Sequence, residues 1–209
     1  MSFSEMYNNM VTLCGRIAKE PTFSHEIMGE GFFDTELIVQ RLSGQDDVVP
    51  LTVSERLMQD GNFEIGNLIS VNGQLRSYNK LVGDKSKLVL KVFVREVLHA
   101  DTSTPNKIEM SGYICKPPIY RTTPFGREIA DLLIAVNRAY NKSDYIPAIA
   151  WGRNARYASS FTVGDKIFVE GRIQSRVYQK QLDDGSVEDR TAYEVSVSKL
   201  EKLAEDTNN

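Results

Sequence analysis

The chain has 209 residues, of which 41% are hydrophobic and 25% charged, a composition typical of a folded globular protein rather than a disordered or collagen-like one. Its net charge of −3 argues against a uniformly basic surface, although an average of this kind conceals local patches. The longest apolar runs are too short to cross a bilayer, and the N-terminus lacks the segments of a secretion signal. We therefore expect a cytoplasmic protein without membrane contact.

The first elements of the chain recur 97 residues later. Residues 8–23 (NNMVTLCGRIAKEPTF) align without a gap with residues 105–120 (PNKIEMSGYICKPPIY). Matched glycines and prolines fix special backbone conformations, so their recurrence indicates a repeated fold. These matches include Gly15 with Gly112, Pro21 with Pro118, Pro50 with Pro147 and, after one inserted residue, Gly73 with Gly171. The sequence thus predicts two copies of one domain.

The two copies are joined by a short polar segment, LHADTSTPNK, whose Thr, Ser, Asp and Pro residues are typical of a connector. We expect a first domain at 1–100, a linker at 101–106, a second domain at 107–203 and a short disordered tail at 204–209. Because the linker is short, the domains should pack side by side.

Each copy is predicted to be all-β. In the second, DKIFVEGRIQSRVY alternates between an apolar face (Ile167 to Val177) and a polar one, and TAYEVSVSKL forms the returning strand of a long hairpin. GRNARYASSF is the one plausible helix of this copy. Five strands and one short helix in about 95 residues favour a five-stranded Greek-key barrel of the oligonucleotide-binding (OB) type, with a sandwich as the alternative.

Residues that could support catalysis are few. His25 and His99 have no partner at ligand spacing, and Asp46–Asp47 is interpreted as part of a turn. No nucleophile elbow, phosphate-binding loop or dinucleotide fingerprint occurs. Cys14 and Cys115 are far apart and are expected to be reduced core residues. We therefore predict a protein that is not an enzyme and needs no metal or cofactor.

Aromatic and basic residues are interleaved in VNRAYNKSDYIPAIAWGR, residues 136–153. Strand alternation directs Tyr145 and Trp151 away from the barrel interior, into which Ile146, Ala148 and Ala150 point. The alternatives are a second core and a subunit interface, both of which are also rich in aromatic residues.

Arginines surround these aromatics and favour single-stranded nucleic acid as the ligand. Unpaired bases stack on aromatic rings at about 1–3 kcal/mol each, while cations neutralise phosphates. The predicted basic residues of the site are Arg121, Arg127, Arg138, Arg153, Arg156, Arg172 and Arg176.

The second copy closely resembles the bacterial single-stranded DNA-binding protein family, through GREIADLLIAVNRAY, DYIPAIAWGRNARYASSFTVGDKIFVEGRIQSRVY and AYEVSVSKLEKL. The resemblance implies an OB fold, a nucleoid-associated role in DNA replication, repair or recombination, and four aromatic positions that contact DNA. In this chain those positions are Tyr140, Tyr145, Trp151 and Tyr178.

The first copy departs from the family pattern at all four positions, where Ser43, Val48, Ser54 and Lys80 stand. Residues 1–104 carry 10 basic and 14 acidic side chains, against 14 and 11 in residues 105–200. The first copy is therefore expected to be mainly architectural, with Arg76, Tyr78 and Lys80 as candidates for a weaker site.

Family members usually end in an acidic tail that recruits replication proteins; the sequence reaches EKLAEDTNN soon after its last strand, so we expect a member that lacks this tail. Because the family assembles four barrels, the resemblance implies a homodimer, with a pseudo-dimeric monomer as the alternative. Two other functions stay open: a replication-restart or plasmid-type factor that chiefly binds a protein partner, and RNA binding.

Overall fold

The computed structural model describes residues 8–83, 85–181 and 185–204. Its first half runs β1 (Asn9–Ile27), β2 (Glu30–Gln40), β3 (Asp46–Ser54), α2 (Glu55–Asp60), β4 (Leu68–Val82) and β5 (Lys85–Leu98). Its second half runs β6 (Asn106–Ile114), β7 (Ile119–Thr122), β8 (Glu128–Arg138), β9 (Lys142–Trp151), α3 (Arg153–Ala158), β10 (Lys166–Gln181) and β11 (Val187–Lys202). The two halves therefore repeat one order of elements, as the sequence comparison predicts.

Each half closes into a five-stranded barrel. In the first, the pairing runs β1–β2–β3–β5–β4 and returns to β1, with β3 and β5 parallel. In the second, it runs β6–β8–β9–β11–β10 and returns to β6, with β9 and β11 parallel. Closure removes the free edges that a sandwich would keep. The predicted fold class, two tandem barrels of the OB type, is confirmed.

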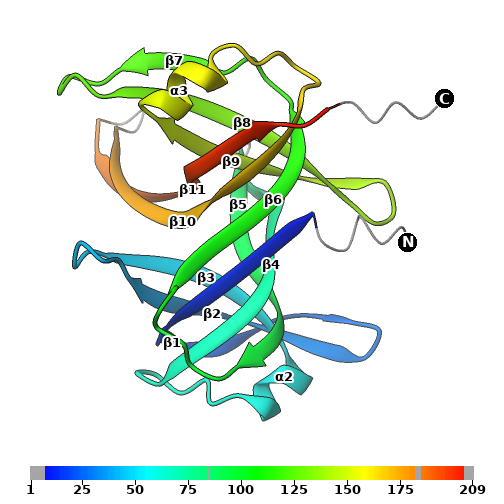
Figure 1. Ribbon diagram of the computed structural model, residues 1–209. Coiled ribbons are helices and arrows are strands. Elements are labelled where there is room, and N and C mark those ends of the chain that lie inside the picture. Colours follow the sequence, from blue (N-terminus) through cyan, green and yellow to red (C-terminus); the bar gives the residue numbers. More distant parts are fainter. Residues whose placement is uncertain (1–7, 84, 182–184, 205–209) are drawn as a thin grey trace.

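Strands β1 and β6 join the two barrels into one continuous sheet. They pair antiparallel, from Asn9 opposite Met110 to Leu13 opposite Asn106. Figure 1 shows them side by side between the barrels, with helices α2 and α3 at opposite ends of the molecule. Asn106, assigned to the linker by the sequence, is therefore already part of this central pairing. The expected tail at 204–209 lies outside the described residues, apart from Ala204.

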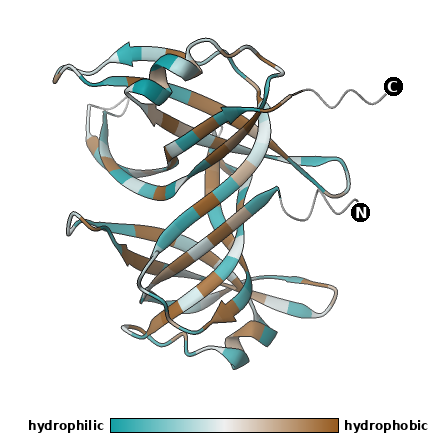
Figure 2. Cartoon of the chain, viewed as in Figure 1, coloured by the Kyte–Doolittle hydropathy of each residue, from teal (hydrophilic) through white to brown (hydrophobic). Residues whose placement is uncertain are grey.

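Apolar side chains fill both barrels, and hydrophobic and hydrophilic residues alternate along the strands (Figure 2). The alternation predicted for β10 is correct as far as Ile173, which is 1% exposed, but wrong at Val177, which is 66% exposed. The reason is that β10 pairs with β6 only up to Gly171 and beyond that residue pairs with β11 alone. The distal hairpin thus extends past the barrel and has no interior face.

Gly15 and Gly112, which the repeat aligns, are required for the same structural reason. A Cβ atom at Gly15 would lie 2.2 Å from the carbonyl oxygen of Ile38, and one at Gly112 would lie 2.6 Å from that of Ala135. Ile38 and Ala135 are themselves separated by the repeat offset. Each barrel therefore needs glycine where its first strand passes closest to the next one.

Cys14 and Cys115 are both free thiols. Cys14 lies in the core at 2% exposure, whereas Cys115 is only partly buried and donates to the carbonyl oxygen of Leu133 at 3.1 Å. Burial raises the pKa of the Cys115 thiol. Among the residues described, no helix is long and apolar enough to span a membrane.

Candidate nucleic-acid interface

Strand β9 carries two of the predicted aromatics on its outer face. Tyr145 and Trp151 are 47% and 37% exposed, while Ile146, Ala148 and Ala150 point into the barrel and are at most 3% exposed. The predicted orientation of this strand is therefore confirmed. Small interior residues let the strands approach closely, and the large rings are left on the surface.

The other two predicted aromatics lie on hairpins that flank β9. Tyr140 is in the β8–β9 turn with φ of 62°, followed by Asn141 at 54°, and its side chain is 88% exposed. Tyr178 lies on the distal part of β10 and is 36% exposed, with the guanidinium carbon of Arg176 5.7 Å from its ring centroid. All four rings of this aromatic surface (Tyr140, Tyr145, Trp151 and Tyr178) thus reach solvent, which excludes a buried second core in the monomer.

Trp151 is held by the neighbouring strand. Its Nε1 donates a hydrogen bond to Oγ of Ser196 on β11 at 3.3 Å. Gly152, which follows with φ of 52°, ends the strand and leads directly into α3. The indole ring is therefore anchored at its polar edge, an arrangement that suits stacking of a base on its open face.

The seven predicted arginines fall into different environments. Arg121 forms an ion pair with Asp131 at 2.8 Å, and Arg156 forms one with Glu128 at 2.7 Å. Both arginines are more than half exposed, and ion pairs of this kind stabilise a fold by at most about 1 kcal/mol. A phosphate could therefore displace these carboxylates at little cost.

Arg138 and Arg172 are committed to the fold. Arg138 Nη1 lies 3.2 Å from Oδ1 of Asp144, and Arg172 Nη1 lies 3.2 Å from Oδ2 of Asp47. Both carboxylates are fully buried. Burial lowers the pKa of Arg172, which nevertheless keeps its charge beside Asp47. Each carboxylate also has a second arginine partner, Arg76 for Asp144 and Arg41 for Asp47, so each buried charge is shared by two arginines of the fold.

Each buried carboxylate also bridges the two barrels. Asp144 of the second barrel accepts from Arg76 Nη1 at 2.9 Å and from the backbone N–H of Ser77 at 2.7 Å, both on β4. Asp47 of the first barrel accepts from the backbone N–H of Ser175 on β10 at 2.8 Å, in addition to its bond with Arg172. The Asp46–Asp47 turn expected from the sequence is therefore wrong: Asp47 lies in β3 and fastens the barrels together.

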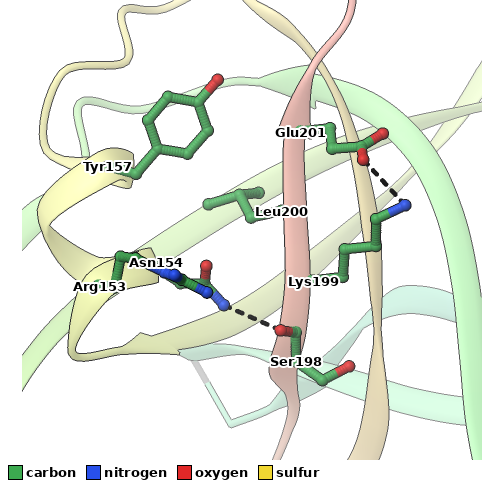
Figure 3. Close-up of a pocket in the computed structure, with 7 residues that line it drawn as sticks. All are labelled: Arg153, Asn154, Tyr157, Ser198, Lys199, Leu200 and Glu201. Atoms are coloured by element: carbon green, nitrogen blue, oxygen red, sulfur yellow. Dashed lines mark hydrogen bonds and ion pairs between the residues drawn. The ribbon is translucent and has the colours of Figure 1, made fainter.

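Three predicted arginines remain exposed without an ion pair to any described residue: Arg127, Arg153 and Arg176. Arg153 starts α3, two residues after Trp151, and lines a hollow of about 430 Å³ between α3 and β11 (Figure 3). In this hollow Leu200 points toward the helix, and Lys199 is paired with Glu201 at 2.8 Å. Arg153 thus follows Trp151 by two residues and has no ion pair with a described residue.

Within the ranges 8–83, 85–181 and 185–204, no three His, Cys, Asp or Glu side chains gather in a way that could hold a metal ion. The geometry instead combines open aromatic rings with exposed cations on one barrel. Such a surface can bind a flat, negatively charged polymer by stacking and charge neutralisation.

Comparison with known proteins agrees with this geometry. Residues 105–203 match the model of the single-strand binding protein family. The chain is 34% identical over 83 residues to single-stranded DNA-binding protein 1 of Staphylococcus aureus, covering 36% of this chain and 50% of that protein. It is 32% identical over 83 residues to single-stranded DNA-binding protein A of Bacillus subtilis, covering 36% and 48%. The match thus spans about half the length of these curated relatives.

The likeness in fold extends over both barrels. The wild-type single-stranded DNA binding protein from Thermus aquaticus superimposes with a TM-score of 0.72, covering 96% of this chain and 95% of that one, at 23% sequence identity. At this identity the comparison concerns the fold, and it supports the arrangement of two barrels in one chain.

Proposed function

Because residues 105–203 of this chain belong to the single-strand binding protein family, we propose that the protein binds single-stranded DNA, largely without sequence preference and without catalysing a reaction. The observation that carries the proposal is the aromatic surface of the second barrel, four solvent-facing rings bordered by unpaired arginines. Bases stack on the rings whatever their identity, since every base has a π-face.

The cations of the site have unequal roles in this proposal. Arg127, Arg153 and Arg176 neutralise phosphates directly, because no carboxylate among the described residues holds them. Arg121 and Arg156 contribute after giving up Asp131 and Glu128, which are partly exposed. The predicted contribution of Arg138 and Arg172 is revised: they position the β8–β9 hairpin and β10 by holding buried carboxylates rather than by contacting phosphate.

A titration with oligo-dT tests the proposal. Trp151 is the only tryptophan in the chain, so its fluorescence reports the second barrel alone. We expect quenching on binding, and weaker binding as salt is added. Unchanged emission together with no mobility shift at low salt would contradict the proposal. A matched RNA oligomer that competes more strongly than the DNA would instead identify RNA as the ligand.

The role of the unpaired arginines has its own test. Replacing Arg153 by glutamine is expected to reduce the slope of log affinity against log salt by about 0.7 for single-stranded DNA, because one phosphate contact is lost. Arg56, at the equivalent position of helix α2, is also exposed and provides the matched control, with no change expected for Arg56→Gln on oligomers that fill one barrel. Equal slopes in the two variants would show that Arg153 does not contact phosphate.

The wider biological role belongs to the same proposal. A protein of this kind acts in DNA replication, repair or recombination, in a cytoplasmic and nucleoid-associated location. A homodimer would present four barrels, and replication proteins are candidate partners. For the domain division, residues 107–203 form the main DNA-binding domain and residues 1–100 are mainly architectural. Mass measurement of the free protein and of its oligo-dT complex tests the homodimer.

A further inference from the structure

Strand pairing shows which residues of the two barrels are equivalent where the sequence offset does not. The parallel pair β3–β5 sets Thr52 opposite Phe93, and the parallel pair β9–β11 sets Ile149 opposite Ser196. Since Thr52 and Ile149 are equivalent in the repeat, Phe93 occupies in the first barrel the place that Ser196 has in the second.

This equivalence identifies an exchange of large and small residues. In the second barrel Trp151 on β9 touches Ser196 on β11 through its hydrogen bond. In the first barrel Ser54 takes the position of Trp151, and Phe93 on β5 takes that of Ser196. Each barrel therefore has one aromatic ring and one serine at this pair of positions, but the ring is provided by a different strand.

Phe93 lies on the outer face of its barrel. Its neighbours Val92 and Val94 point inward and are at most 1% exposed, so strand alternation directs Phe93 outward, where it is partly exposed. Its ring packs against Phe32, with centroids 5.6 Å apart, and Phe32 is stacked in turn on the exposed ring of His25 at 5.0 Å. The Phe93 ring is thus partly open to solvent and is held in place by its contact with Phe32.

Tyr78 extends this surface along β4. It is 45% exposed, and Lys91 Nζ lies 5.7 Å from its ring centroid. Burial lowers the pKa of Lys91, but hydrogen bonds with Asp34 and Tyr78 outweigh this effect, so the pKa is raised and the side chain stays charged. Gln74 lies opposite Phe93 in the β4–β5 ladder. Since alternate residues of a strand share a face, Gln74 and Tyr78, four residues apart, lie on the same face of β4.

Exposed cations border the two rings. Lys80, Lys87 and Arg95 are exposed and form no ion pair with a residue in the described part of the chain. Among the described residues of β2, β4 and β5, Asp34 holds Lys91 and Glu96 lies exposed at the end of the ladder. Arg76 is occupied by Asp144 of the other barrel, so it does not add to the free charge.

We propose that the first barrel carries a second binding face for single-stranded DNA, formed by Phe93 and Tyr78 with Lys80, Lys87 and Arg95. The proposal rests on the proposed function of the second barrel, since it assigns the same class of ligand. It extends the weaker site expected at Tyr78 and Lys80 in a copy that is otherwise mainly architectural. Phe93 stands on β5, which has no aromatic position in the family pattern, and Tyr78 stands on β4 two residues before Lys80, the equivalent of Tyr178.

The test uses the full chain and compares oligo-dT lengths. An oligomer of about 12 nucleotides fills one barrel, and one of about 35 nucleotides reaches both. The variant Tyr78→Ala/Phe93→Ser should bind the long oligomer at least about 10-fold more weakly and the short one as the parent does. Phe23→Ala is the control, because Phe23 contacts Phe33 on the opposite face of β2 from Phe32.

The outcomes separate the two proposals. No quenching of Trp151 by the short oligomer in the parent protein contradicts the proposed function itself. Normal short-oligomer binding, with long-oligomer affinity unchanged by the double variant, overturns the second face alone. Because Phe93 packs on Phe32, folding of the variant is checked by thermal melting. If the variant is unfolded, Lys80→Gln/Lys87→Gln provides the test instead. The slope of its log affinity against log salt should be reduced by about 1.4 for the long oligomer only.

A transplant tests the exchange of positions directly. In the second barrel, Trp151→Ser should weaken binding of a labelled short oligomer about 5- to 150-fold, measured by anisotropy. Adding Ser196→Phe moves the ring to the place that Phe93 has in the first barrel, and we expect it to recover at least a third of the lost binding free energy. No recovery in a folded double variant would show that this position cannot present a ring to DNA.

Discussion

Replacement of Asp144 by alanine is expected to lower the free energy of unfolding by about 3–5 kcal/mol, the usual cost of removing one partner of a buried ion pair. The carboxylate is fully buried and accepts from Arg76, Arg138 and the backbone of Ser77. Without it, two guanidiniums face each other across the barrel boundary with no anion between them. Urea or thermal unfolding of the variant measures the loss.

An exposed carboxylate of the same barrel provides the control. Asp131 pairs with Arg121, and both side chains are well exposed, so Asp131→Ala should cost less than about 1 kcal/mol. Asp144→Asn should fall between the two, because the amide keeps an acceptor for Ser77 but loses the charge. Equal stabilities of Asp144→Ala and Asp131→Ala would mean that the barrels do not depend on this carboxylate.

The combined variant Tyr140→Ala/Trp151→Ala should weaken binding of a short oligo-dT by about 2–6 kcal/mol, since two stacked bases lose their rings. Tyr140 is 88% exposed and Trp151, which is 37% exposed, lies on the outer face of the barrel, so the fold should be retained; melting temperature is the check. Because the variant has no tryptophan, anisotropy of a labelled oligomer replaces intrinsic fluorescence as the measurement.

The control for this variant is Phe23→Ala, which removes an exposed ring from the first barrel. It should leave short-oligomer affinity unchanged. A loss of less than about threefold in a folded Tyr140→Ala/Trp151→Ala variant would contradict stacking as the source of affinity. The residual binding would then have to come from phosphate contacts, and the slope of log affinity against log salt would equal that of the parent protein, because no cation has been removed.

Much of the fold is readable from the sequence because its signals are local or periodic. The alternation along residues 142–151 places Tyr145 and Trp151 outside, and the matched glycines reveal the repeat. Both signals need only one strand, or one comparison of the chain with itself. The extent of the inner face on β10 could not be read in this way, since it depends on where β6 ends beside it.

The roles of the charged residues were less predictable. In the sequence, Arg138 and Arg172 resemble any other basic residues near aromatics. In the structure each forms an ion pair with a buried carboxylate, and the partner of Arg172 is 125 residues away in the chain. Phe93 was missed for another reason. The offset between the copies is 97 residues at β3 and β9 but 103 at β5 and β11, as Phe93 and Ser196 show, so a fixed offset compares the wrong residues there.

The pairing of β1 with β6 inside one chain has a consequence for how such a protein can evolve. Two identical subunits related by a two-fold axis must use a surface that fits itself. Here β1 always pairs with β6 of the same chain, whatever the protein concentration, so the two sides of the boundary need not be identical. The two sides differ in the order of one residue pair: β4 has Gln74 and then Arg76, whereas the equivalent strand β10 has Arg172 and then Gln174. In both strands the arginine donates a hydrogen bond to the glutamine two residues away. Covalent linkage has turned a symmetric contact into two halves that mutation can tune separately.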